Sequence, residues 1–193
     1  MDGYYDHSPL VLVERPVVIT SPLREFTRAV TYRTASLLGL PFHDIDRLVE
    51  HRAGKTIEQL VLEEGEGAYR SAEAGCLATV LDERPTGLIA LADQDHLWIG
   101  AGQAHQPSDW TVVILDFELP NLYWRIQSTA RDRETSHWHP LFEGIPESVS
   151  DLRPFWSAWR RAQPASSMRF SADNLTVAQT SQRLQDWIQG GSE

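Results

Sequence analysis

Five short segments with the length of β-strands divide the chain, and two of them are almost wholly apolar. These two, 87–92 and 110–117, lack the alternation of apolar and polar residues that marks a strand with one face in water. A continuous apolar run of this length is typical of a strand buried on both faces of a parallel sheet. The predicted strands are 17–20, 41–43, 87–92, 110–117 and 167–173.

Segments with helical spacing of their apolar residues lie between these strands. The first follows Ser21-Pro22, which predicts an N-cap and a proline at the first helical position. Gly39 predicts the end of this helix near Leu38, because glycine readily adopts the left-handed conformation that ends helices. Further helices are predicted at 46–52, 56–63, 66–81, 119–131, 148–161 and 176–189. Alternating strands and helices predict a three-layer, doubly wound α/β fold with ligands at the carboxyl ends of its parallel strands.

Composition favours an ordinary folded domain in a reducing compartment. The chain has 193 residues and a formal net charge of −10, which argues against tight binding to nucleic acid. Its single cysteine, Cys76, excludes a disulfide within the chain. No signal peptide or membrane-spanning stretch is visible, so we expect a cytoplasmic protein that binds neither nucleic acid nor membrane.

The chain is expected to form one domain with an irregular N-terminal arm. Residues 1–15 are polar and aromatic without periodicity, whereas the predicted elements occupy 16–193. Residues 131–144 are rich in histidine and arginine and predict a long loop. No internal repeat or low-complexity linker suggests a second domain.

The turn after the first predicted strand lacks the residues of a phosphate-binding loop. Such a loop reads G-x-x-x-x-G-K-[ST], and its glycines allow backbone amides to converge on a phosphate. Here 20–27 reads Thr-Ser-Pro-Leu-Arg-Glu-Phe-Thr, and the only lysine in the chain is Lys55. Acidic residues nevertheless follow the second strand, at Asp44 and Asp46.

Three neighbouring segments together resemble the shikimate kinase family. Leu-Gly-Leu-Pro-Phe-His-Asp44-Ile-Asp46 is similar to the family's LGxxFxDxD strand end, and 50–58 to its IExxxGxSIxEIF stretch. Residues 64–73 are similar to the EGExxFRxxE helix. Weaker similarity continues to about 188, at 139–142, 159–162 and 168–173. The resemblance implies a P-loop kinase architecture with a lid at about 131–144.

The resemblance also implies roles for individual residues. Asp46 matches the aspartate that orients the substrate hydroxyl, which would make it the catalytic residue of an active enzyme. Asp44 matches the aspartate near the magnesium shell. Arg70 matches the arginine that binds the substrate carboxylate, a task suited to a bidentate guanidinium. Arg161, or its neighbour Arg160, matches the arginine after the lid that holds the same carboxylate.

Departures from the family pattern fall mainly on the nucleotide side. Phe26-Thr27-Arg28-Ala29 stands where the family has GKS/TT, so the phosphate-binding lysine and the magnesium-binding hydroxyl are displaced or missing. The triple glycine after the third strand becomes Ala92-Asp93-Gln94, and the lid arginine becomes His139. These changes predict a degenerate Walker A site.

Each candidate residue has an alternative interpretation. Arg24, Thr27 and Arg28 could form an unconventional phosphate site at a helix N-terminus, with Arg133 as a lid cation. Glu25, however, adds a negative charge at the same place.

The acidic and basic residues of the predicted substrate site also have purely structural interpretations. Asp44 and Asp46 could simply cap the following helix. Arg70 and Glu73 could form an i,i+3 surface pair, which contributes only about 0.2–0.5 kcal/mol. For Asp44 and Asp46 the similarity of the flanking residues favours the inherited site, whereas for Arg70 both interpretations stay open.

The leading hypothesis is a pseudokinase that binds a shikimate-like carboxylate or acts as a regulatory or partner-binding module. It predicts no cofactor. A first alternative is an atypical active shikimate kinase, for which Mg-ATP would be required. A second is a purely structural interaction protein, with Trp138, Trp156 and Trp159 marking a surface for a protein partner.

Overall fold

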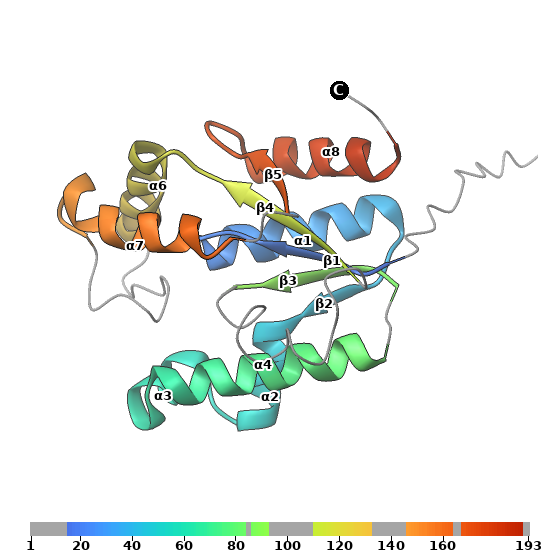
Figure 1. The fold of residues 1–193 in the computed structure, drawn as a ribbon, viewed down its shortest axis with the longest axis horizontal. Coiled ribbons are helices and arrows are strands. Elements are labelled where there is room, and N and C mark those ends of the chain that lie inside the picture. Colours follow the sequence, from blue (N-terminus) through green and yellow to red (C-terminus); the bar gives the residue numbers. More distant parts are fainter. Residues whose placement is uncertain (1–14, 84–85, 93–109, 133–145, 164–166, 191–193) are drawn as a thin grey trace, which may run out of the picture.

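A parallel sheet of five strands forms the centre of the protein (Figure 1). The computed structural model describes residues 15–83, 86–92, 110–132, 146–163 and 167–190. All four strand pairs are parallel, in the order β2-β3-β1-β4-β5. The five predicted strands are therefore confirmed, with the bounds of β1 as predicted, β2 shifted by one residue and the other three shorter. They are β1 (Val17–Thr20), β2 (Phe42–Asp44), β3 (Leu88–Leu91), β4 (Thr111–Asp116) and β5 (Met168–Ser171).

The predicted helices are also present, within one to two residues of their expected ends. None of the helices in the described segments is long and apolar enough to cross a membrane. The helices are α1 (Arg24–Leu38), α2 (Ile45–Ala53), α3 (Ile57–Glu64), α4 (Glu66–Asp82), α6 (Leu119–Asp132), α7 (Val149–Arg161) and α8 (Val177–Ile188).

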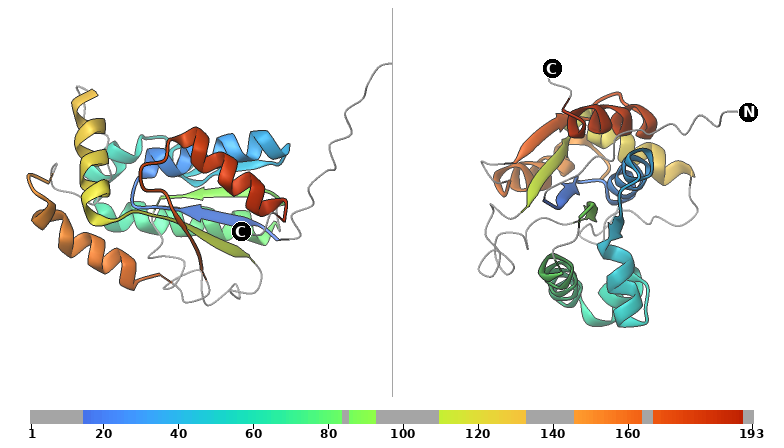
Figure 2. Two further views of the ribbon diagram at one scale, coloured as in Figure 1. Left: turned by 90° about the horizontal axis from the view of Figure 1, so that it is seen from above. Right: turned by 90° about the vertical axis from the view of Figure 1, so that its right-hand side faces the viewer.

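Helices cover both faces of the sheet, so the fold has three layers (Figures 1 and 2). Successive side chains of a strand point to opposite faces. Val17 and Ile19 of β1 therefore pack in one core with α1 and α8, whereas Val18 packs in the other with α2 and α4. The three inner strands β1, β3 and β4 are rich in apolar residues because both of their faces are buried, whereas the edge strands β2 and β5 are half-buried or exposed and carry polar residues.

Local sequence signals explain most helix ends, but the start of α1 differs from the prediction. Thr56, Ser148 and Thr176 form capping boxes at the starts of α3, α7 and α8. Gly39 ends α1 in the left-handed conformation as predicted. Ser21 does not cap α1: the helix begins at Arg24 after Leu23, because the Ser21 hydroxyl bonds within the preceding turn.

The topology places the β1–α1 turn where open α/β sheets bind ligands. Strand β1 lies between β3 and β4: the strand that follows β1 in the chain, β2, lies on one side of it, and the strand that follows β4, β5, lies on the other. A crevice outside the carboxyl ends of the strands forms at such a switch point. The turn at 21–23 and the residues after β2 are therefore the first places to examine for a functional site.

Gly87, directly before β3, is expected to tolerate no side chain. Its φ is +133°, and a Cβ there would lie 2.4 Å from the carbonyl oxygen of Pro41. We expect Gly87→Ala to lower the free energy of unfolding by about 1–3 kcal/mol, measured by urea denaturation. The control is Gly75→Ala in α4, where a Cβ meets no atom within 4 Å. It should be neutral or stabilising by about 0.5–1 kcal/mol, and equal effects of the two changes would contradict this account.

Candidate functional site

A turn of only three residues connects β1 to α1. Strand β1 ends at Thr20 and α1 begins at Arg24, so only residues 21–23 lie between them. The Ser21 hydroxyl lies 2.7 Å from that of Thr27 and accepts the Leu23 N–H at 3.0 Å. Thr27 also donates to the Leu23 carbonyl oxygen at 3.1 Å. The side chains of Ser21 and Thr27 thus hold the turn closed through their own hydrogen bonds.

Aromatic packing fills the space beside this turn. The Phe26 ring is buried and meets Phe117 edge-on, with ring centroids 5.4 Å apart. The Arg125 guanidinium of α6 lies over both rings, 4.7 Å from the Phe26 centroid and 5.1 Å from that of Phe117. Arg125 also donates to the carbonyl oxygens of Ala172 and Leu175. Sequence reasoning missed Arg125, because nothing along the chain links α6 to the start of α1.

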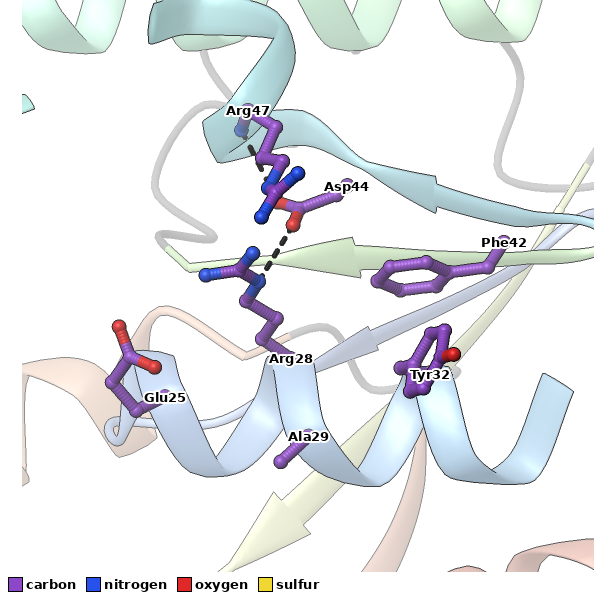
Figure 3. Close-up of a pocket in the computed structure, with 7 residues that line it drawn as sticks. All are labelled: Glu25, Arg28, Ala29, Tyr32, Phe42, Asp44 and Arg47. Atoms are coloured by element: carbon purple, nitrogen blue, oxygen red, sulfur yellow. Dashed lines mark hydrogen bonds and ion pairs between the residues drawn. The ribbon is translucent and has the colours of Figure 1, made fainter. Parts of the chain in front are cut away.

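Asp44 caps α2 and pairs with an arginine of α1 (Figure 3). Its Oδ1 accepts the backbone N–H of Arg47 at 3.2 Å, which confirms the interpretation of Asp44 as a helix cap. Its Oδ2 lies 2.7 Å from Nε of Arg28. A residue predicted at the magnesium shell and one predicted at the nucleotide phosphates are therefore paired with each other.

Asp46 lies in a buried network with Arg24, Tyr69 and Glu73. The exposed fraction of Asp46 is 6%, and Tyr69 and Glu73 are fully buried. Asp46 Oδ2 accepts from Arg24 Nε at 2.5 Å, and Oδ1 lies 3.2 Å from the Tyr69 hydroxyl. That hydroxyl also lies 3.1 Å from Glu73 Oε1. Both carboxylate oxygens of Asp46 are thus engaged by the protein itself.

Burial controls the ionisation of this network. Burial raises the pKa of Asp46, and the Arg24 guanidinium opposes that rise. Burial lowers the pKa of Arg24, but the Asp46 carboxylate outweighs it and the net pKa is raised. Burial and the neighbouring Glu73 raise the pKa of Tyr69 well above its ordinary value, so Tyr69 remains a donor. Arg24 is the cation that keeps the buried Asp46 carboxylate compensated.

The predicted carboxylate-binding arginines lie on two helices. Arg70 of α4 pairs with Glu66 one turn earlier. Glu73 does not lie at the surface, as the alternative of an i,i+3 surface pair with Arg70 assumed: it is fully buried, and its Oε1 lies 3.1 Å from the Tyr69 hydroxyl.

The two neighbouring arginines of α7 differ in what they contact. Arg160 binds Asp116 at the end of β4 through two contacts, Nε to Oδ1 at 3.2 Å and Nη2 to Oδ2 at 2.5 Å. Its guanidinium also stacks on Trp156, 4.3 Å from the ring centroid. Among the residues that the structure describes, Arg161 donates to the carbonyl oxygen of Ser157 in its own helix, at 3.2 Å. Arg160 is therefore the residue of this pair that reaches the carboxyl end of the sheet.

Several predicted features lie outside the described residues. These are most of the N-terminal arm, most of the lid, Arg133, His139, and the Asp93-Gln94 segment. Within the described part of the chain, no group of three or more His, Cys, Asp or Glu could hold a metal ion. The roles of Asp44, Asp46, Arg70, Arg160 and Arg161 toward a ligand therefore stay predictions.

Comparison with known sequences connects this geometry to one family. The shikimate kinase family model matches residues 28–188. The shikimate kinase of Chlorobium luteolum is 32% identical over 157 residues, which cover 78% of this chain and 70% of that protein. That of Symbiobacterium thermophilum is 29% identical over 183 residues, 88% of this chain and 96% of the relative. A shikimate kinase of Caulobacter vibrioides is 46% identical over 57 residues, so this match spans only 28% of its length.

Solved structures show the same fold. Shikimate kinase from Bacteroides thetaiotaomicron aligns with a TM-score of 0.66 and 19% identity, over 91% of this chain and 98% of that chain. Shikimate kinase from Acinetobacter baumannii in complex with shikimate aligns with a TM-score of 0.67 and 19% identity, over 92% and 94%. At this identity the structures support the fold, whereas the family model covers most of the chain. The protein therefore belongs to the shikimate kinase family.

Proposed function

We propose that this protein is a catalytically inactive member of its family, whose fold serves as a small-molecule-binding or regulatory module. The observation that carries this proposal is the 2.5 Å ion pair between Arg24 and Asp46. In the family, the segment containing Arg24 is the phosphate-binding loop, and the aspartate matching Asp46 orients the attacking hydroxyl. Phosphoryl transfer must bring the nucleotide phosphates and the substrate hydroxyl together. Here the Arg24 guanidinium, a group of the protein itself, binds the aspartate that would orient that hydroxyl.

The β1–α1 turn supports the same proposal. Phosphoryl transfer depends almost wholly on positioned electrostatic groups, and the glycine-rich loop with its lysine supplies many of them. Here three residues make the turn, and the ring of Phe26 packs on Phe117 where the family has glycine. We expect the loss of the loop and its lysine to lower the phosphotransfer rate by about 10³-fold or more.

The described residues fit Mg-ATP poorly. The Thr27 hydroxyl, nearest in position to the family's magnesium ligand, is bonded to Ser21 and to the Leu23 carbonyl oxygen. Asp44, the other predicted magnesium residue, is paired with Arg28. A guanidinium supplies the positive charge that a metal ion would otherwise supply beside this carboxylate. We therefore derive no catalytic step through Mg-ATP.

A small hydroxylated carboxylate is the ligand proposed for the substrate side. Arg70 lies on α4, the helix that also carries Tyr69 of the Asp46 network. Its guanidinium is partly exposed and pairs with Glu66 at the surface, a contact that an incoming carboxylate can replace. The Acinetobacter relative was solved with shikimate, which makes shikimate the probe to use first.

Calorimetric titration with shikimate, with and without Mg-ATP, tests this proposal. We expect shikimate to bind equally in both conditions and a coupled assay to detect no ADP formation. Arg70→Gln should weaken shikimate binding about tenfold, because it removes a charge-assisted hydrogen bond. The control, Arg153→Gln, changes an exposed arginine of α7 and should leave affinity unchanged.

Two results would contradict the proposal in different ways. Shikimate-dependent ADP formation would support the alternative of an atypical active kinase. Absence of shikimate binding in both conditions would exclude the small-carboxylate ligand and favour a partner-binding protein.

Removing the Arg24 cation is expected to destabilise the fold. Arg24→Gln leaves the buried Asp46 carboxylate without its ion pair, which should lower the free energy of unfolding by about 3–5 kcal/mol. Because burial raises the folded-state pKa of Asp46, protonation relieves this defect. The deficit relative to the parent protein should therefore be smaller at low pH and grow as pH rises through that pKa.

Urea denaturation across a pH series measures this effect. The double variant Arg24→Leu with Asp46→Asn should be more stable than Arg24→Gln, since it leaves no buried charge uncompensated. Arg33→Gln, at an exposed position of the same helix, is the control and should have little effect. A pH-independent deficit in Arg24→Gln would rule out the uncompensated Asp46 charge as its cause.

A further inference from the structure

A pocket of about 600 Å³ lies at the edge of the sheet, separate from the Asp46 network (Figure 3). Four of its lining residues come from one face of α1, at the i, i+3, i+4 and i+7 spacing of a helix. The others come from the edge strand β2 and the first turn of α2. The described residues that line it are Glu25, Arg28, Ala29, Tyr32, Phe42, Asp44 and Arg47.

The charged groups at one end of the pocket are not all compensated. Asp44 pairs with Arg28 and also accepts the N–H at the start of α2. The guanidinium of Arg47 and the carboxylate of Glu25 form no hydrogen bond or ion pair with any other described residue. The Glu25 carboxylate does act electrostatically on the neighbouring Arg24, but that guanidinium is already paired with Asp46. One cation and one anion thus line the same pocket without a hydrogen bond or ion pair in the part of the chain that the structure describes.

The other end of the pocket is aromatic. The Tyr32 and Phe42 rings meet edge-on, with centroids 5.5 Å apart and an interplanar angle of 72°. Tyr32 is 60% exposed, which is unusual for a large aromatic side chain and leaves a ring face free for contact. In Figure 3 these two rings lie at one end of the group, with Glu25 at the other and the Arg28–Asp44 pair between.

We propose that this pocket binds a free α-amino acid with an aromatic side chain. The ligand carboxylate would bind Arg47 and its ammonium group Glu25, while its ring packs on Tyr32 and Phe42. A purely anionic ligand would leave Glu25 uncompensated, and a purely cationic one would leave Arg47 uncompensated. This second site goes beyond the proposed function and does not depend on whether ATP or shikimate binds.

Four probes separate the groups that the pocket is proposed to recognise. Calorimetry is performed on the full chain with L-phenylalanine, 3-phenylpropionate, phenethylamine and L-alanine. The last three lack the ammonium group, the carboxylate and the ring, respectively. We expect measurable binding of L-phenylalanine and about tenfold or weaker binding of each truncated probe, since each loses one contact. Equal binding of L-phenylalanine and any truncated probe would overturn the proposal.

Substitutions of pocket residues, compared with substitutions outside the pocket, test whether L-phenylalanine binds at this site. Arg47→Gln should abolish the preference for L-phenylalanine over phenethylamine, and Glu25→Gln its preference over 3-phenylpropionate. Tyr32→Ala should weaken L-phenylalanine binding about tenfold, since a stacking contact is lost. The controls on α1 are Arg33→Gln and Leu37→Ala, two exposed positions outside the pocket.

The result that overturns the proposal is specific to this site. L-phenylalanine binding that survives Arg47→Gln and Tyr32→Ala unchanged, or the absence of binding to the parent protein, would exclude an amino-acid site here. Circular dichroism of each variant checks that the fold is retained, and Tyr32→Leu replaces Tyr32→Ala if the latter unfolds. Shikimate titration of the same variants should be unaffected, which distinguishes failure here from failure of the proposed function.

Discussion

The buried ion pair between Arg24 and Asp46 is the contact around which the carboxyl edge of the sheet is organised. Asp46 is 6% exposed, so its charge requires a compensating cation. Arg24 can supply it because α1 begins immediately after a three-residue turn. The short turn places the first residue of α1, Arg24, beside the buried Asp46 carboxylate, whose charge it compensates.

A second ion pair between an arginine of α1 and an aspartate lies one helical turn further along α1, where Arg28 pairs with Asp44. The two arginines of α1 thus place positive charge against two carboxylates that follow β2, Asp46 and Asp44. In an active kinase, a metal ion and a substrate hydroxyl would lie near such carboxylates. Under the proposed function, internal compensation of this kind is what keeps these carboxylates stable without a bound metal ion or substrate.

Family membership and fold were predictable from the sequence, whereas the partners of the site residues were not. The segment 37–73 carries the family resemblance, and the alternation of short strand-like segments with helical ones places all five strands. Arg24 and Arg28 were recognised as candidate cations for phosphate, but their contacts with Asp46 and Asp44 join residues at least 16 positions apart. Tyr69 and Glu73 were missed as network members because their burial depends on packing between α2 and α4.

The sequence by itself determined the order of the elements, the approximate ends of the helices and the residue types in the turn between β1 and α1, since these depend on local periodicity and composition. Only the tertiary structure decided which charges meet. The rotation of α1 about its axis directs Arg24 and Arg28 toward the carboxylates, and it turns Glu25 and Tyr32 into the edge pocket. That rotation is set by packing of Phe26 and Val30 in the core, which involves residues from distant strands and helices.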